Sequence, residues 1–371
     1  MKRISTLSAL AVFTLGSFVA RAQFTVDGSL GTGEVGTGTG KYQLVGTYTN
    51  SHTTADRGLK ALYVGTTATT LNILVVASPE TSAYQALALY LDVPNKTGIA
   101  AGTQLPGGDD GTSQLRSKPT LDMPVDYAFR MTTSPLGTGG STTYYSKLDY
   151  TGTPNTAGTY QDKYLGPASK TGTPLVITDA TTNIVDARFA FQTSTSGSVS
   201  ANTTSGWEIQ LPLAALGGAA AGTNVRMMVA FVNDDATFTA ETLPQVAGQT
   251  AALGTNPNFA SIAGGQNYTY QVGTGVLAAR SVGASLHAAA YPNPLAADSR
   301  LLYTVADQTQ PVTVEALNSL GQRAALLLDA APQAPGEHSL ALAPLQRLAP
   351  GVYLVRVQAG SQLTSQRVVV N

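Results

Sequence analysis

Residues 87–93 read LALYLDV, and two apolar stretches precede them closely, LYV at 62–64 and LNILVV at 71–76. Short polar turns separate the three stretches, which is the pattern of an antiparallel meander. No run of ten or more residues has apolar side chains at helical period, so we expect helices to be few and short. Further strands are predicted at residues 127–131, 187–193, 207–211, 225–233 and 268–273.

The composition narrows the class of protein. The chain has 371 residues, with 38 Gly, only 12% charged residues and a formal net charge of −1. A nucleic-acid-binding surface requires clustered Lys and Arg, so no nucleic-acid partner is expected. With no Cys, the chain has no disulfide, thiolate nucleophile, zinc–thiolate site or iron–sulfur cluster. The sequence predicts an all-β protein: a large antiparallel, jelly-roll-like β-sandwich at 23–275, followed by a small immunoglobulin-like β-sandwich.

The N-terminal 22 residues have the pattern of a secretory signal peptide. Two cations at positions 2 and 3 precede an apolar run at 7–19, and small residues lead to Ala22. Cleavage is therefore expected between Ala22 and Gln23. No later stretch approaches the roughly 20 uninterrupted apolar residues of a transmembrane helix, so no transmembrane segment is expected. We expect a secreted or cell-surface protein that passes through the periplasm.

The composition changes near residue 276, and residues 276–288 are interpreted as a linker. From residue 289 onward short runs alternate apolar and polar residues, which predicts a small two-sheet sandwich at 289–371. Its motifs are YPNP (Tyr291, Pro292, Asn293 and Pro294), NSLGQ at 318–322, GEHSL at 336–340, LAPGVYLVRV at 348–357 with Gly351 and Tyr353, and RVVV at 367–370.

These motifs resemble the type A C-terminal sorting domain of the type IX secretion system. The resemblance implies a partner, the outer-membrane translocon of Bacteroidota. It also implies cleavage of the domain, followed by release or attachment to a surface glycolipid. The alternative is a fibronectin-like accessory module that binds sugar or a neighbouring domain.

The preceding region resembles family-nine carbohydrate-binding and DOMON-type sandwiches. The resemblance implies a β-sandwich with polysaccharide as a ligand. The family's tryptophan after the Asp-Gly pair is absent here. The segments that carry the resemblance are TVDGSL at 25–30, ALYV at 61–64, LNILV at 71–75, LYLD at 89–92 and GWEIQLPLAAL at 206–216.

Aromatic residues are the candidate sugar-binding groups. Trp207 shares a strand face with Ile209 and Leu211, so it is assigned to the core. Five tyrosines, Tyr150 among them, instead lie in a region that is rich in Gly and Thr and short of aliphatic residues, and four of the five are the candidates. We expect them to be exposed and to stack on sugar rings, with fastening of a loop as the alternative. They are Tyr144, Tyr145, Tyr160 and Tyr164.

Acidic pairs at Asp109-Asp110 and at Asp234-Asp235 are candidate calcium ligands, because Ca²⁺ prefers oxygen ligands from loops. A solvated turn is favoured for Asp109-Asp110, and calcium and a solvated turn are equally weighted for Asp234 and Asp235. No other cofactor is expected.

Catalytic motifs are lacking. The large sandwich holds a single histidine, His52, which lies in a polar stretch and is expected at the surface. No H-E-x-x-H or G-x-S-x-G motif is present, so no catalytic residue is assigned. The sequence favours a secreted, non-enzymatic glycan-binding protein. The alternatives are an adhesive or structural surface protein without a small ligand, a glycoside hydrolase and a DOMON-type redox module.

Overall fold

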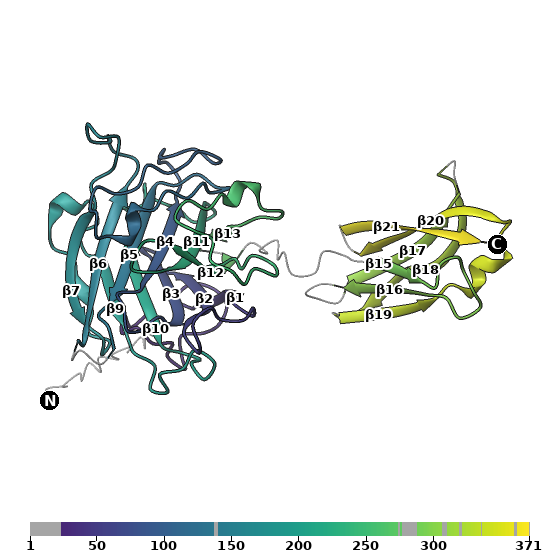
Figure 1. Cartoon of the computed structure of the whole chain (residues 1–371), viewed down its shortest axis with the longest axis horizontal. Coiled ribbons are helices and arrows are strands. Elements are labelled where there is room, and N and C mark those ends of the chain that lie inside the picture. The colour runs from purple at the N-terminus through teal and green to yellow at the C-terminus, as the bar shows by residue number, and fades with distance from the viewer. Residues whose placement is uncertain are drawn as a thin grey trace, which may run out of the picture. The chain divides into compact units, whose positions relative to one another are not determined.

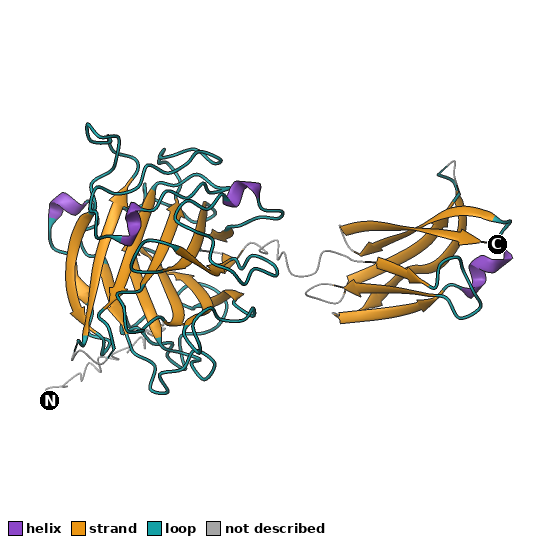
Figure 2. Cartoon of the chain, in the orientation of Figure 1, coloured by secondary structure: helices purple, strands orange, loops and turns teal. Residues whose placement is uncertain are grey.

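A computed structural model describes residues 24–136, 140–273, 275–276, 288–305, 310–318, 321–334, 336–359 and 362–370. The predicted signal peptide with its Ala22–Gln23 cleavage site, and nearly all of the predicted linker, lie outside these residues. Internal contacts divide the chain into two units, Met1–Ala279 and Arg280–Asn371. Both units consist of β-sheet with only short 3-10 turns in the described ranges (Figure 2), so the all-β prediction is confirmed.

The first unit is a sandwich of two antiparallel sheets (Figure 1). As described, one sheet has the order β1 (Gln43–Thr47), β2 (Gly58–Thr66), β3 (Thr70–Ser78), β10 (Gly206–Pro212), β9 (Arg188–Phe191) and β8 (Leu175–Val176). The other has the order β14 (Gly275–Val276), β13 (Tyr268–Gln271), β11 (Asn224–Val232), β4 (Ala86–Asp92), β5 (Tyr127–Thr133), β6 (Thr142–Asp149) and β7 (Lys163–Ser169), while β12 (Phe238–Leu243) also pairs with β11.

Alternating side chains fill the space between the two sheets. Leu71, Ile73 and Val75 of β3 belong to the same buried cluster as Leu89 of β4. Trp207 on β10 lies in this cluster with no exposed surface, which confirms its assignment to the core. Each such aliphatic side chain contributes roughly 1.5–3 kcal/mol by leaving water. The inward faces of the strands therefore hold the sandwich together.

The LALYLDV strand is apolar throughout because both of its faces are buried. Tyr90 and Ala88 point away from the inter-sheet core and pack in a second cluster. The loop between β4 and β5, with η1 (Gln114–Arg116), covers this outer face through Leu105 and Leu115. Strands buried on both faces read as continuous apolar runs. The same covering loop positions the pocket described below.

Strands β6 and β7 are not among the predicted strands. Their sequences, TTYYSKLD and KYLGPAS, contain few aliphatic residues, so the apolar alternation that identifies a strand is missing. Thr and Tyr nevertheless favour extended backbone, and β6 pairs with β5 along its length. Tyr144, Tyr145 and Tyr164 thus lie on strands of the sheet, whereas Tyr160 lies in the loop between β6 and β7.

The second unit is a smaller antiparallel sandwich in its described residues. One sheet contains β15 (Ala288–Tyr291), β16 (Arg300–Val305) and β19 (Gly336–Ala341), and the other contains β18 (Arg323–Gln333), β17 (Gln310–Leu317), β20 (Gly351–Ala359) and β21 (Gln362–Val370). The first, second and fifth strands of the unit form one sheet and the others form the second, as in immunoglobulin-like sandwiches. It has its own buried cluster.

The short helical turns are η1, η2 (Ala180–Thr182), η3 (Phe259–Ser261) and η4 (Ala343–Arg347). Within the described ranges no helix has the length and apolar character needed to cross a bilayer.

Candidate functional site

A pocket of about 630 Å³ opens on the outer face of the larger sheet of the first unit. It lies beside β5, β6 and β7, where the loop carrying η1 and the turn between β11 and β12 form its rim. Its lining combines aromatic, amide and charged side chains. These residues are Tyr84, Asp110, Gly111, Thr112, Gln114, Arg116, Arg130, Thr132, Tyr144, Tyr164 and Asp234.

Strand register brings the floor of this pocket together. Arg130 and Thr132 are two residues apart on β5, so their side chains share a face. Tyr144 of β6 pairs with Thr132. Ser146, two residues further along β6, pairs with Arg130 and on its other side with Tyr164 of β7. Three neighbouring strands therefore present their outward side chains to one pocket.

Three tyrosines supply the aromatic surface. Tyr84 and Tyr164 are 48% and 53% exposed, and Tyr144 is half-buried. The rings of Tyr84 and Tyr144 have centroids 6.4 Å apart and planes tilted by 51°. The predicted candidates Tyr144 and Tyr164 thus line one pocket. Tyr84 was missed because it lies in an unpatterned loop before β4, far from the Tyr-rich region in sequence.

The expectation that Tyr145 and Tyr160 are exposed is wrong. Tyr145 has no exposed surface and packs against Phe189 with ring centroids 5.5 Å apart. Neighbouring residues on a strand point to opposite faces, so Tyr144 and Tyr145 cannot both face the pocket. Tyr160 is buried edge-on against Tyr150 at 5.0 Å, which fastens the loop after β6. The alternative role of fastening a loop holds for Tyr160.

Gln114 organises the pocket floor. Its side-chain oxygen accepts hydrogen bonds from Arg130 Nη1 at 3.0 Å and from Thr132 Oγ1 at 3.1 Å. Its amide nitrogen donates to the carbonyl oxygen of Tyr84 at 2.9 Å. This buried amide therefore fixes the position of the guanidinium relative to the backbone that carries Tyr84.

Arg130 is a buried cation, with 8% of its surface exposed. Burial lowers the pKa of its guanidinium, while the charges of Asp162 and Asp110 act in the opposite direction. Among the described residues, no ion pair within 4.0 Å includes Arg130. Its Nε atom is buried and has no hydrogen-bond partner. The guanidinium thus retains an unused donor.

The acidic pairs of the sequence contribute one residue each to the rim. Asp110 Oδ1 accepts hydrogen bonds from the backbone and hydroxyl of Thr112, both at 2.8 Å. The backbone bond is the main reason that the pKa of Asp110 is lowered. Asp234 is exposed and lines the pocket, whereas Asp235 is not among the lining residues and accepts from Thr237 N at 2.9 Å.

The part of the chain that the structure describes contains no cluster of three or more His, Cys, Asp or Glu able to hold a metal. Calcium at Asp234 and Asp235 stays a prediction.

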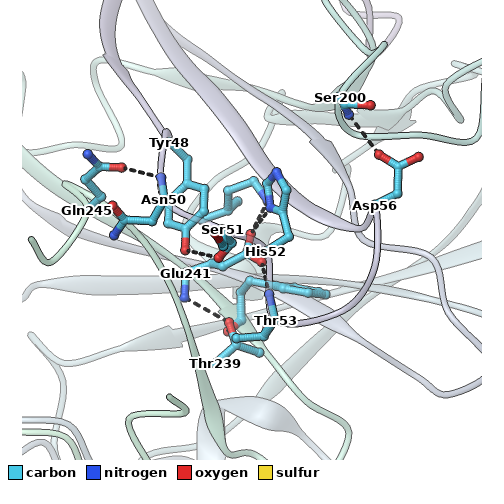
Figure 3. Close-up of polar contacts among 12 residues, drawn as sticks. Tyr48, Asn50, Ser51, His52, Thr53, Asp56, Ser200, Thr239, Glu241 and Gln245 are labelled. Atoms are coloured by element: carbon cyan, nitrogen blue, oxygen red, sulfur yellow. Dashed lines mark hydrogen bonds and ion pairs between the residues drawn. The ribbon is translucent and has the colours of Figure 1, made fainter. Parts of the chain in front are cut away.

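His52 does not lie free at the surface. Its Nδ1 is 3.1 Å from Oε2 of the fully buried Glu241, which also accepts from Leu59 N at 2.8 Å (Figure 3). Thr53 N donates to the other carboxylate oxygen at 3.2 Å. Glu241 thereby fastens the loop after β1 to β12. Neither His52 nor Glu241 lines the pocket beside β5, β6 and β7.

A second buried carboxylate, that of Glu208, connects the first and last segments of the sequence that resemble carbohydrate-binding sandwiches, residues 25–30 and 206–216. Glu208, next to Trp207, accepts hydrogen bonds through Oε2 from Asp27 N and Gly28 N, both at 2.8 Å. Its Oε1 accepts from Tyr42 Oη at 2.8 Å. Burial raises the pKa of Glu208 to about 7. The Asp-Gly opening is therefore held against β10 by a residue 180 positions later in the chain.

The sorting-like motif of the second unit connects its first segment to its last strand. Asn293 Nδ2 donates to the carbonyl oxygen of Arg367, and Val369 N donates to Asn293 Oδ1, both at 2.9 Å. Gly351 and Tyr353 lie on β20 and pair with β21 near its end. Tyr291 is 77% exposed.

Pro292 and Pro294 flank Asn293, and the carbonyl oxygen of Pro292 accepts from Ser299 Oγ at 2.8 Å. The motif residues at both ends of the unit thus meet around β21.

No family model matches this chain, and no curated protein matches it. Solved structures that match include dimeric latent PorU from Porphyromonas gingivalis, with 11% identity and a TM-score of 0.19 over 81% of this chain. They also include PorZ from the same organism, described as an essential surface component of its type-IX secretion system, with 14% identity and a TM-score of 0.18 over 81% of this chain. The chain spans 31% and 43% of those two proteins. TM-scores this low do not establish a shared fold.

Proposed function

We propose that the first unit is a non-enzymatic glycan-binding module of a secreted or cell-surface protein. The observation that carries the proposal is the gathering of Tyr84, Tyr144 and Tyr164 around one pocket that also presents amide, hydroxyl and charged groups. A pyranose offers an apolar C–H face to an aromatic ring and hydroxyl groups to polar side chains. Each ring contributes roughly 0.5–1.5 kcal/mol beyond its buried area, so three rings support a weak but specific site.

The alternative function for the same pocket is that of a glycoside hydrolase, because two carboxylates, Asp110 and Asp234, line it. Hydrolysis needs one carboxyl group with a raised pKa that donates a proton to the leaving oxygen. The pKa of Asp110 is instead lowered by the bonds from Thr112. Asp110 is therefore better suited to accept hydrogen bonds from sugar hydroxyls than to donate a proton.

In this proposal calcium would bind only as an ion that bridges the pocket carboxylates and the hydroxyl groups of the sugar. Ca²⁺ takes 6–8 oxygen ligands. The two pocket carboxylates would supply a minority of them, and ligand hydroxyls and water would supply the rest. Asp235, turned toward Thr237 in the hairpin, is the less suited of the predicted pair.

The test is binding of the purified chain to a panel of polysaccharides by affinity electrophoresis and calorimetry, in Ca²⁺ and in EDTA. We expect micromolar to millimolar affinity for at least one polysaccharide, without release of reducing ends. The double variant Tyr84→Ala/Tyr164→Ala should lose this binding, because it removes the two most exposed rings of the pocket. The matched control is Tyr291→Ala, which removes a tyrosine of the second unit that is more exposed than either pocket ring. Absence of binding across the panel in both ion conditions would refute the proposal.

For the second unit we propose the role of a type IX sorting domain, with the outer-membrane translocon as its partner. The sequence motifs support this role. Asn293 and Gly351 both contact the end of β21, so the motif residues lie in one small region of the sandwich.

A further inference from the structure

The floor of the tyrosine-lined pocket carries a positive charge that the protein leaves without a close counter-ion. Arg130 is 8% exposed, and its nearest carboxylates in the described part of the chain lie beyond 4.0 Å. Burying an unpaired charge is strongly unfavourable, so buried cations are normally paired. Gln114 supplies only a neutral acceptor to one nitrogen of the guanidinium.

The guanidinium itself keeps a free donor. Arg130 Nε is buried without a hydrogen-bond partner, whereas Ser146 and Asp162 beside it interact with each other. Ser146 is the cross-strand neighbour of Arg130, and the charge of Asp162 acts on the guanidinium. Native proteins pair the great majority of such buried groups. The unpaired Nε of Arg130 is therefore a donor that a ligand with an acceptor group can complete.

Resting on the glycan-binding function proposed above, we propose that the pocket binds an acidic sugar whose carboxylate pairs with Arg130. A planar carboxylate matches the fork of guanidinium donors and forms charge-assisted hydrogen bonds with it. The sugar ring then stacks on Tyr144 of β6, the strand that pairs with β5 and its Arg130, and on Tyr164 of β7, the cross-strand partner of Ser146. Uronic acids carry both a pyranose ring and a carboxylate, so a uronate-containing polysaccharide is the ligand class.

General electrostatic attraction does not account for such binding. Two arginines, Arg116 and Arg130, and two aspartates, Asp110 and Asp234, line the pocket, so their charges balance. The chain as a whole has a formal net charge of −1. A polyanion is therefore not drawn to this protein by bulk charge, and selectivity has to come from the local pair with Arg130. Asp110 and Asp234 at the rim accept sugar hydroxyls.

The test compares polysaccharides with and without a charged carboxylate. Polygalacturonate and its fully methyl-esterified form share one backbone, and esterification neutralises each carboxylate and adds one methyl group. The full-length chain should bind polygalacturonate about tenfold or more tightly than the ester, which is the loss expected when a charge-assisted pair becomes neutral. Equal affinity for the two, with binding abolished by Tyr84→Ala/Tyr164→Ala, would overturn the acidic-sugar assignment and leave the glycan-binding function standing. No binding to any polysaccharide of the panel would overturn both.

The variant Arg130→Met tests the residue. It keeps a long apolar side chain and removes a buried charge, so the melting temperature should be unchanged or higher. Binding of polygalacturonate should fall by about tenfold, and the preference for polygalacturonate over the ester should be lost. The matched control is Arg116→Met, which removes the other pocket arginine and should change the affinity less than threefold or so, since Arg116 is partly solvated.

Two further arms decide the remaining outcomes. Arg130→Lys keeps the positive charge but loses the paired N–H donors of the guanidinium. It should bind polygalacturonate with an affinity between those of the wild type and Arg130→Met. This variant tests the role of Arg130 even if Arg130→Met does not fold. Dextran sulfate tests the other common anion of polysaccharides. Binding of dextran sulfate in preference to polygalacturonate, or equal losses in Arg116→Met and Arg130→Met, would overturn the assignment of a carboxylate to Arg130.

Discussion

Glu208 connects the N-terminal segment of the first unit to the centre of the smaller sheet. It lies beside the core residue Trp207, and its carboxylate accepts two backbone N–H groups and the hydroxyl of Tyr42. Burial outweighs these bonds and raises the pKa of Glu208 from its ordinary value of 4.5 to about 7. The folded chain therefore binds this proton more tightly than the unfolded chain does.

Glu208 should make the first unit more stable in mild acid. Its contribution is fully present below pH 4.5 and is lost as the pH rises through about 7. Glu208→Gln keeps an oxygen for the two N–H groups and cannot ionise. Its free energy of unfolding should therefore lack the decrease with pH that Glu208 causes in the wild type, which is up to about 3 kcal/mol between pH 4.5 and 7. Urea unfolding of both proteins across this pH range measures the difference.

The exposed Asp235→Asn is the control, and its unfolding curve should follow the wild type. A Glu208→Gln protein with the same pH slope as the wild type would contradict the argument.

Trp207 should report folding rather than ligand binding. It is the single tryptophan of the chain and has no exposed surface. Its fluorescence should be blue-shifted and unaffected by polysaccharide. Trp207→Ala should destabilise the first unit by about 3–5 kcal/mol, because it leaves a large cavity between the sheets. Tyr84→Ala, at an exposed pocket position, should leave the melting temperature within about a degree or two. A ligand-dependent shift of the Trp207 emission would contradict the core assignment.

At the scale of the element, β6 lines the candidate pocket with one face and the core between the sheets with the other. Its outward residue Tyr144 lines the pocket, and its inward residue Tyr145 packs against Phe189. Thr143 Oγ1 donates to Tyr145 Oη at 3.0 Å, so the buried hydroxyl also has a partner. One strand therefore contributes to the site and to the core through adjacent positions.

The variants Tyr144→Ala and Tyr145→Ala should have opposite effects. Tyr144→Ala should weaken polysaccharide binding severalfold and leave the melting temperature nearly unchanged. Tyr145→Ala should lower unfolding free energy by about 3–5 kcal/mol, and any folded fraction should bind normally. Calorimetry and thermal unfolding on the same samples separate the two effects. Loss of binding without loss of stability in Tyr145→Ala would contradict the register of β6.

At the scale of the whole molecule, each unit has its own core. The clusters of the first unit draw on residues between 24 and 272, and the cluster of the second unit draws on residues between 288 and 370. Residues 24–276 and residues 288–371 should therefore each fold as separate fragments. Their calorimetric transitions, added together, should reproduce the unfolding of the joined chain. A fragment without a cooperative transition would show that its core is incomplete.

Export provides the test of the sorting role. A chain that ends at residue 288 should accumulate, folded, in the periplasm of a Bacteroidota host with an intact type IX system, because it lacks the motif region around Asn293 and Gly351. Cell fractionation locates the protein, and the same host expressing the full chain is the control. Fusion of residues 289–371 to a periplasmic reporter should carry the reporter to the surface or the medium. Arrival of the truncated chain in the medium would overturn the assignment.

Local pattern was sufficient for much of the fold. The meander around LALYLDV, the strand that carries Trp207 and the alternation of the second unit are read from neighbouring residues, because alternation along a strand is a property of a few consecutive positions. The burial of Trp207 follows from its two companions on the same face. The same reasoning applied to β6 would have separated Tyr144 from Tyr145, but a region rich in Gly and Thr carried no aliphatic alternation to identify the strand.

By itself the sequence determined that this chain is all-β, where most of its strands lie and which aromatic residue belongs to the core. Only the tertiary structure decided which tyrosines share a surface. The pocket joins Tyr84, Arg130, Tyr164 and Asp234, which come from separate strands and turns. Their proximity depends on strand order and on a loop folded over the outer face of a sheet. Both arise from pairings between residues distant in sequence, and no pattern of neighbouring residues contains them.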